Sequence, residues 1–178
     1  FLKAALRKKG KSAALVPLLA PALSLTAKLK RRLQSNRLAE SFDLESEAGA
    51  VDTLWREKLT ECPRLLALRS ARALRWHYPK ERGALFVGVK RSGRLLGYGV
   101  LLSDHALAIG LRRWRLADLF VLEDDPLVAA AILAESFRLT QEAGAHVLEA
   151  TGLPKELQLC LDSSGAFMRD LPTWPAYY

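Results

Sequence analysis

Cysteine is nearly absent from this 178-residue sequence, and long uncharged stretches are absent as well. The two cysteines, Cys62 and Cys160, lie 98 positions apart, with no Cys-x-x-Cys motif and no histidine at ligand spacing. This spacing excludes a disulfide framework and a zinc site, and it predicts reduced thiols in a cytoplasmic protein. The longest nearly uncharged run, residues 12–27, is 16 residues long and holds two prolines. A membrane-spanning helix needs about 20 apolar residues, so this run does not predict one.

Glycine and proline are also scarce, with 11 and 8 copies, so the chain is neither collagen-like nor low in complexity. Half of the residues are apolar, which excludes global disorder and suits a single globular core. The sequence starts at Phe1 and not at a methionine, so we expect further chain upstream.

Acidic residues are missing from residues 1–37, which hold six lysines and four arginines and therefore carry a charge of +10. The other 141 residues hold 17 basic and 19 acidic side chains, so their net charge is −2. The excess of +8 is thus confined to an N-terminal arm. We place a domain boundary after Arg37, between a basic helical connector, residues 1–37, and a globular domain, residues 38–178.

The arm has the pattern of an amphipathic helix, with apolar residues on one stripe and basic residues elsewhere. The stripe is formed by Leu18, Ala22, Leu25, Leu29 and Leu33. Such a helix fits packing on a neighbouring domain, including one upstream of Phe1, or binding to an anionic membrane surface. A secretory signal is disfavoured by the basic run that follows at once. Nucleic acid is disfavoured because Phe1 is the only aromatic residue of the arm.

After the arm, short strand patterns alternate with helical ones. Strand or extended patterns occupy residues 37–44, 84–90, 95–103, 111–122, 146–150 and 166–178. Helical patterns occupy residues 51–61, 63–77, 125–143 and 154–163. Gly93 supplies a positive φ for a hairpin turn between the second and third strands. The late strand–helix–strand unit implies one parallel crossover beside antiparallel strands, so we expect a mixed α/β fold with a mostly antiparallel, twisted sheet and flanking helices.

Several short segments then resemble the GNAT superfamily of acyl-CoA N-acyltransferases. Residues 86–100 (FVGVKRSGRLLGYGV) resemble its second and third strands, and residues 118–121 (DLFV) with the following helix resemble its fourth strand and third helix. Residues 165–167 (GAF) resemble the entry into its sixth strand. Residues 55–57 and 73–78 resemble segments of bacterial tandem proteins in which a GNAT-like half follows another half. The resemblance implies a GNAT-like fold that uses acetyl-CoA or another acyl-CoA.

The family's coenzyme A loop is altered in this sequence. The resemblance places a glycine-rich loop between the fourth strand and the third helix, where backbone N–H groups and the helix N-terminus hold the pyrophosphate. Here Pro126 stands at the basic position, and Ala129 and Ala131 stand at the glycine positions. Proline removes an N–H donor, and the alanine side chains hinder a close backbone approach. Glu123 to Asp125 add negative charge, so capping of the helix by these acids is the competing interpretation.

The candidate catalytic groups are two carboxylates. Asp118 in the fourth strand and Glu149 in the fifth are candidates for the base that takes the proton of an amine, although either can simply pair with a neighbouring arginine such as Arg115. Backbone N–H groups at Phe120 and Val121 are candidates for the thioester site. The tyrosine that acts as general acid in the family is replaced by Leu161.

His77 and Tyr78 are the other proton donors of suitable type. The residue pattern suggests no metal site, and it suggests no serine hydrolase because Ser163 and Ser164 lack His and Asp partners at a motif spacing.

Two functions therefore remain open. The first is an acyltransferase that moves an acyl group from acyl-CoA to the amine of a small molecule or peptide. The second is a catalytically inactive GNAT-like half that serves as a scaffold or binding module.

Overall fold

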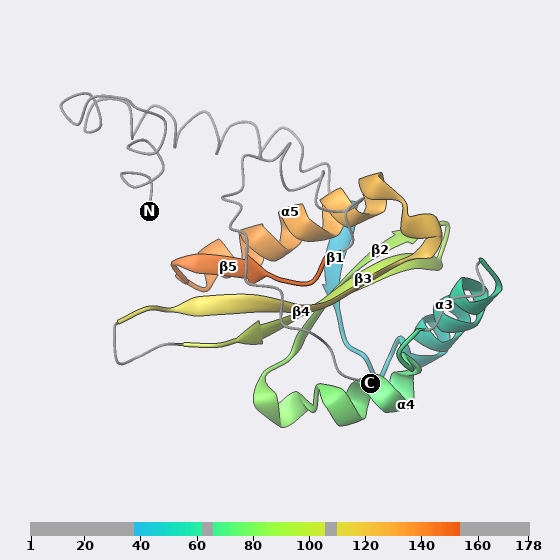
Figure 1. The fold of residues 1–178 in the computed structure, drawn as a ribbon, viewed down its shortest axis with the longest axis horizontal. Helices are drawn as coiled ribbons and strands as arrows, with labels where there is room; N and C mark the ends of the chain where they lie inside the picture. Colours follow the sequence, from blue (N-terminus) through green and yellow to red (C-terminus); the bar gives the residue numbers. More distant parts are fainter. Residues whose placement is uncertain (1–37, 62–65, 106–109, 154–178) are drawn as a thin grey trace, which may run out of the picture.

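The computed structural model describes residues 38–61, 66–105 and 110–153. They form a five-stranded sheet in the order β1-β2-β3-β4-β5, covered by α3 and α4 on one face and by α5 on the other (Figure 1). The strands are Ala39–Phe42 (β1), Leu85–Arg91 (β2), Arg94–Ser103 (β3), Arg113–Val121 (β4) and Val147–Ala150 (β5). The helices are Ala48–Glu61 (α3), Ala71–His77 (α4) and Pro126–Glu142 (α5), with short 3₁₀ turns at Lys80–Arg82 (η2) and Leu122–Asp124 (η4).

The pairing of the strands confirms the mixed sheet expected from the sequence. Neighbours from β1 to β4 are antiparallel, and β5 runs parallel to β4. The β2–β3 turn has positive φ at both central residues, 51° at Ser92 and 78° at Gly93, which gives the turn the twist that a two-residue hairpin needs. The expected positive φ at Gly93 is confirmed.

Helix α5 makes the parallel crossover possible, and its ends follow simple chemistry. At its start, Pro126 occupies the first turn and the carboxylate of Asp125 accepts the N–H of Leu127 at 2.8 Å. At its other end, Gly144 adopts a φ of 67°, which stops the helix. The helix therefore returns the chain to the sheet beside β4, as the strand–helix–strand pattern predicts.

The prediction of one helix over residues 63–77 is wrong for residues 66–70. Among the described residues, helix begins only at Ala71. The Ser70 hydroxyl accepts the N–H of Ala73 at 3.3 Å, and a carboxylate oxygen of Asp52 accepts the N–H of Ala71 at 2.7 Å. These two acceptors satisfy N–H groups that have no partner inside α4, so the helix starts there despite the apolar pattern upstream.

Two apolar cores lie on opposite faces of the sheet, and β4 contributes to both. Phe120 packs against Trp55 of α3, whereas Leu116 and Val121 belong to the core under α5. The register explains this change, because Val100 pairs with Asp118 but Leu101 pairs with Leu116. Ala117 is thus an extra residue, a β-bulge that reverses which face each later side chain points to.

Several predictions concern residues outside the described ranges. These are the helix over residues 154–163, the extended segment 166–178, Cys160, Leu161 and the whole arm of residues 1–37. The boundary after Arg37 stays a prediction for the same reason. No helix among the described residues is long and apolar enough to cross a membrane.

Candidate functional site

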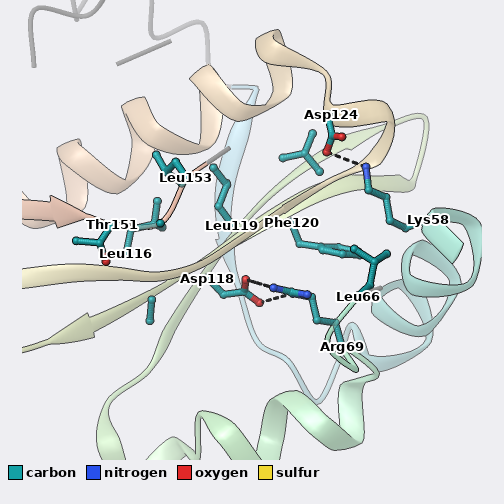
Figure 2. Close-up of a pocket in the computed structure, with 13 residues that line it drawn as sticks. Lys58, Leu66, Arg69, Leu116, Asp118, Leu119, Phe120, Asp124, Thr151 and Leu153 are labelled. Atoms are coloured by element: carbon teal, nitrogen blue, oxygen red, sulfur yellow. Dashed lines mark hydrogen bonds and ion pairs between the residues drawn. The ribbon is translucent and has the colours of Figure 1, made fainter. Parts of the chain in front are cut away.

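A cavity opens where β4 and β5 separate (Figure 2). The two strands pair only from Arg113 with Val147 to Leu116 with Ala150, and the bulge at Ala117 follows directly. Beyond that point a cavity of about 440 Å³ lies between the strand ends. The described residues that line it are Lys58, Leu66, Arg69, residues 116–121, Asp124 and residues 151–153. The candidate residues Asp118, Phe120 and Val121 therefore share one site.

Asp118 is joined to Arg69, a residue from the irregular segment before α4. Nε of Arg69 lies 2.9 Å from Oδ2 and 3.2 Å from Oδ1 of the carboxylate, and Nη2 lies 3.1 Å from Oδ1. The guanidinium also lies over the ring of Phe120, 5.1 Å from its centroid. A two-point contact with a carboxylate and a stacking contact with an aromatic ring together fix the plane of the arginine.

Two tyrosines surround this ion pair from the core side. Tyr98 is fully buried, and its hydroxyl donates to Oδ2 of Asp118 at 3.5 Å. The hydroxyl of Tyr78 donates to the carbonyl oxygen of Ala117 at 3.4 Å. Burial, and then the negative charge of Asp118, raise the pKa of Tyr98 well above its usual value. The same two causes, in the same order, raise the pKa of Tyr78. Both phenols therefore stay protonated at neutral pH.

Arg69 itself is partly buried, which acts to lower the pKa of its guanidinium. The hydrogen bonds and the negative charge of Asp118 outweigh this burial, so the pKa of Arg69 is raised overall. Arg69 is therefore a permanent cation throughout the physiological range.

A second ion pair lies at the other end of the cavity. Nζ of Lys58 in α3 lies 2.9 Å from Oδ1 of Asp124 and 2.7 Å from Oε2 of Glu61. The Lys58 side chain is 2% exposed, so its charge is compensated almost entirely by these carboxylates. The N–H of Glu123 donates to Glu61 at 2.7 Å, and Glu123 and Asp124 both have positive φ. Helix α3 thus holds the strained turn between β4 and α5 in place.

The start of α5 does not suit a pyrophosphate in this structure. Pro126 has no N–H, and the N–H of Leu127 is already taken by the carboxylate of Asp125. The N–H of Ala129 donates to the carbonyl oxygen of Asp125 at 3.0 Å, and Ala129 is fully buried against the sheet. Ala131 packs at the margin of the same core. Ala129 and Ala131 are not among the described residues that line the cavity, and their contact with coenzyme A stays a prediction.

Glu149 lies outside the cavity, paired with Arg113 at 2.8 Å. Asp104 joins both Arg113 and Arg115 at 2.6 Å, so Arg115 is not the partner of Asp118. The two candidate bases are therefore not brought together: Asp118 lines the cavity, and Glu149 belongs to a half-buried charge cluster with Arg113 and Asp104. His77 is exposed. Among the described residues, no group of three or more His, Cys, Asp and Glu side chains could hold a metal ion.

Lys58 and Arg69 were not predicted as site residues from the sequence. Both pair with acids that lie far away in the sequence, 66 and 49 positions on. Lys58 stands in an amphipathic helix where a lysine is ordinary, and Arg69 stands in a segment read as helix. A single sequence carries no local signal for either contact, because each depends on how α3 and the segment before α4 pack on β4.

Comparison with known proteins supports the fold. No protein-family model matches the sequence, and no curated protein sequence matches it. Solved structures do match. A ribosomal-protein-alanine N-acetyltransferase from Brucella melitensis biovar Abortus 2308 is 17% identical, with a TM-score of 0.59 over 79% of this chain and 99% of that one. A probable acetyltransferase is 21% identical, with a TM-score of 0.56 over 79% and 98% of the two chains.

A glucosamine-6-phosphate N-acetyltransferase from Arabidopsis thaliana is 7% identical, with a TM-score of 0.57 over 79% of this chain and 97% of that one. Proteins with different acceptors in their names thus share this architecture. The chain has the fold of the GNAT N-acetyltransferases. These neighbours say nothing of a tandem arrangement, which stays a prediction.

Proposed function

We propose that this chain is an acyl-CoA-dependent N-acyltransferase that binds the thioester between β4 and β5. The observation that carries the proposal is the cavity beside the bulge at Ala117, in a sheet of GNAT topology. Past Leu116, β4 no longer pairs with β5, so backbone N–H and C=O groups on that edge of β4 can bind an extended ligand such as the pantetheine arm of coenzyme A.

The proposed reaction is a direct transfer. The amine nitrogen attacks the thioester carbonyl carbon, a C–N bond forms, and the C–S bond breaks. Phe120 and Val121 line the cavity, and the N–H groups of successive strand residues point to opposite sides. The one of these two N–H groups that points away from β3 is the proposed donor to the oxyanion. Asp118 is the proposed base for the proton of the amine, because it lines the cavity whereas Glu149 does not. Tyr78 is the proposed acid for the departing thiolate, because its protonated hydroxyl lies at the bulge, where it donates to the carbonyl oxygen of Ala117.

Calorimetric titration with acetyl-CoA, followed by a thiol-release assay with a panel of amines, tests this proposal. We expect micromolar binding, and we expect Asp118→Asn to lower kcat by roughly 10²–10⁴-fold if it removes the base. Asp104→Asn is the matched control, because that aspartate also pairs with arginines but lies outside the cavity. No heat of binding and no thiol release with any amine would overturn the proposal.

We propose the inactive scaffold as the second candidate, on a separate observation. The start of α5 is closed to an anion by Pro126 and by the capping carboxylate of Asp125. Three acids in succession, Glu123 to Asp125, add repulsion for a pyrophosphate. The same titration separates the candidates, because a strict scaffold binds no acetyl-CoA.

A further inference from the structure

The charged side chains that line the described cavity have alternating signs. Lys58 and Arg69 are cations, and Asp118 and Asp124 are anions, so this part of the wall carries no net charge. Figure 2 shows the two ion pairs on either side of Phe120. A wall of acids alone would suit a polyamine, and a wall of cations alone would suit an anion. The observed wall suits a ligand that carries both charges.

Arg69 keeps donors that no described residue uses. A guanidinium has five N–H groups. The contacts to Asp118 use Nε and one N–H of Nη2, and the carbonyl oxygen of Ala67 accepts one N–H of Nη1 at 3.2 Å. Within the described ranges, the second N–H of Nη1 and that of Nη2 have no acceptor. The Arg69 side chain is 23% exposed, so a ligand can reach it. Two N–H groups on neighbouring nitrogens match the geometry of a carboxylate.

We propose that the acyl acceptor is an α-amino acid or a similarly compact zwitterion, with its carboxylate on Arg69 and its amine beside Asp118. This inference rests on the proposed acyltransferase function. Arg69 and Asp118 touch at 2.9 Å, so a ligand that engages both must carry its opposite charges close together, as an α-amino acid does on one carbon. A lysine side chain within a peptide offers only the cation and leaves the Arg69 donors unfilled.

The rest of the cavity wall favours an apolar side chain on this acceptor. Leu116, Leu119 and Leu153 line the part of the cavity away from the Arg69–Asp118 pair (Figure 2). Burial of apolar surface there would add to affinity at about 25 cal/mol per Å². L-Leucine is therefore a suitable probe, and L-leucinamide and isoamylamine are its matched analogues without the carboxylate.

Ligand-observed NMR and calorimetry on the full chain measure binding of the three probes, with and without acetyl-CoA. We expect L-leucine to bind at least tenfold more tightly than either analogue. We expect Arg69→Gln to remove that preference and Arg69→Lys, which keeps the charge but loses the paired donors, to weaken it. In thiol release, both variants should raise the KM for L-leucine about tenfold or more with a smaller change in kcat. Arg94→Gln is the control, because Arg94 also donates from Nε and Nη2 to a carboxylate, here to one oxygen of Glu57, away from the cavity.

The outcomes separate the inference from the function on which it rests. Acetyl-CoA binding without any preference for L-leucine would overturn the zwitterion site and leave the acyltransferase proposal standing. An Arg69-dependent preference for L-leucine without acetyl-CoA binding would overturn the acyltransferase and keep the amino-acid site. If Arg69→Gln melts well below the parent, Arg69→Lys decides. An unchanged preference in a folded Arg69→Lys variant would overturn the assignment of the carboxylate to Arg69.

Discussion

Replacement of Lys58 by methionine tests whether α3 holds the turn between β4 and α5. The lysine is 2% exposed and its ammonium touches both Glu61 and Asp124. Methionine fills a similar volume with a flexible apolar chain, so the change removes the charge without leaving a large cavity. The change takes away the ammonium that touches both Glu61 and Asp124.

The magnitude follows from the exposure of those carboxylates. Removal of one partner from a fully buried ion pair costs about 3–5 kcal/mol. Here the side chains of Glu61 and Asp124 are 20% and 38% exposed, so water can solvate the two carboxylates and the loss of stability is smaller. We expect Lys58→Met to lower the free energy of unfolding by about 2–3 kcal/mol, which lies at or below the lower end of the range for buried pairs. At this chain length the loss corresponds to a fall in Tm of roughly 5–10 °C.

Thermal and urea unfolding followed by circular dichroism measure this loss. A double-mutant cycle with Asp124→Asn should give a coupling of about 1–2 kcal/mol, because the two residues touch. The coupling should change little in high salt, since Lys58 is screened from solvent. A Tm within 2 °C of the parent, or a coupling near zero, would show that Lys58 does not hold the turn between β4 and α5.

Four further predictions concern single substitutions and pH. Gly97→Ala should destabilise the chain by about 1–3 kcal/mol in urea unfolding, because the new Cβ would lie 2.9 Å from the carbonyl oxygen of Phe120; an unchanged midpoint would contradict the close approach. Ser92→Asn should raise Tm slightly, by about 1–3 °C, since asparagine tolerates the φ of 51° better than serine. Asp125→Ala should cost about 1 kcal/mol through loss of the α5 cap, whereas Asp125→Asn should cost less. The raised pKa values of Tyr78 and Tyr98 contribute stability that is present below about pH 10 and is lost as the pH rises through the pKa values of the folded state. Absorbance at 295 nm during an alkaline titration should therefore show a late phase of tyrosine ionisation, and Tyr98→Phe should reduce the amplitude of that phase.

Sequence patterns predicted the parts of the fold that local chemistry decides. The β2–β3 hairpin follows from Gly93, and α5 follows from its apolar spacing between Asp125 and Gly144. The start of α4 was missed because a carboxylate 19 residues upstream, that of Asp52, accepts its first N–H. An apolar pattern does not show where such a distant acceptor lies.

The candidate site was predicted only in part, because, as at the start of α4, some of its contacts join residues that are far apart in the sequence. Asp118 stood out as a carboxylate within an apolar strand, and the structure places it at the cavity. Lys58 and Arg69 reach that cavity only through the packing of separate segments. Ala129 was placed at a glycine position by alignment with a family loop, and its burial could not be read from its spacing.

The bulge at Ala117 makes the length of β4 as important as its composition. Before it, even-numbered residues such as Leu116 face α5, and after it the even-numbered Phe120 faces α3. Loss or gain of one residue there would exchange Asp118 and Leu119 between the two layers, with a carboxylate under α5 and a leucine beside Arg69. A one-residue deletion in this strand would move every later side chain to the opposite face of the sheet. The number of residues in β4, more than any single side chain, therefore keeps Asp118 and Arg69 in the same layer.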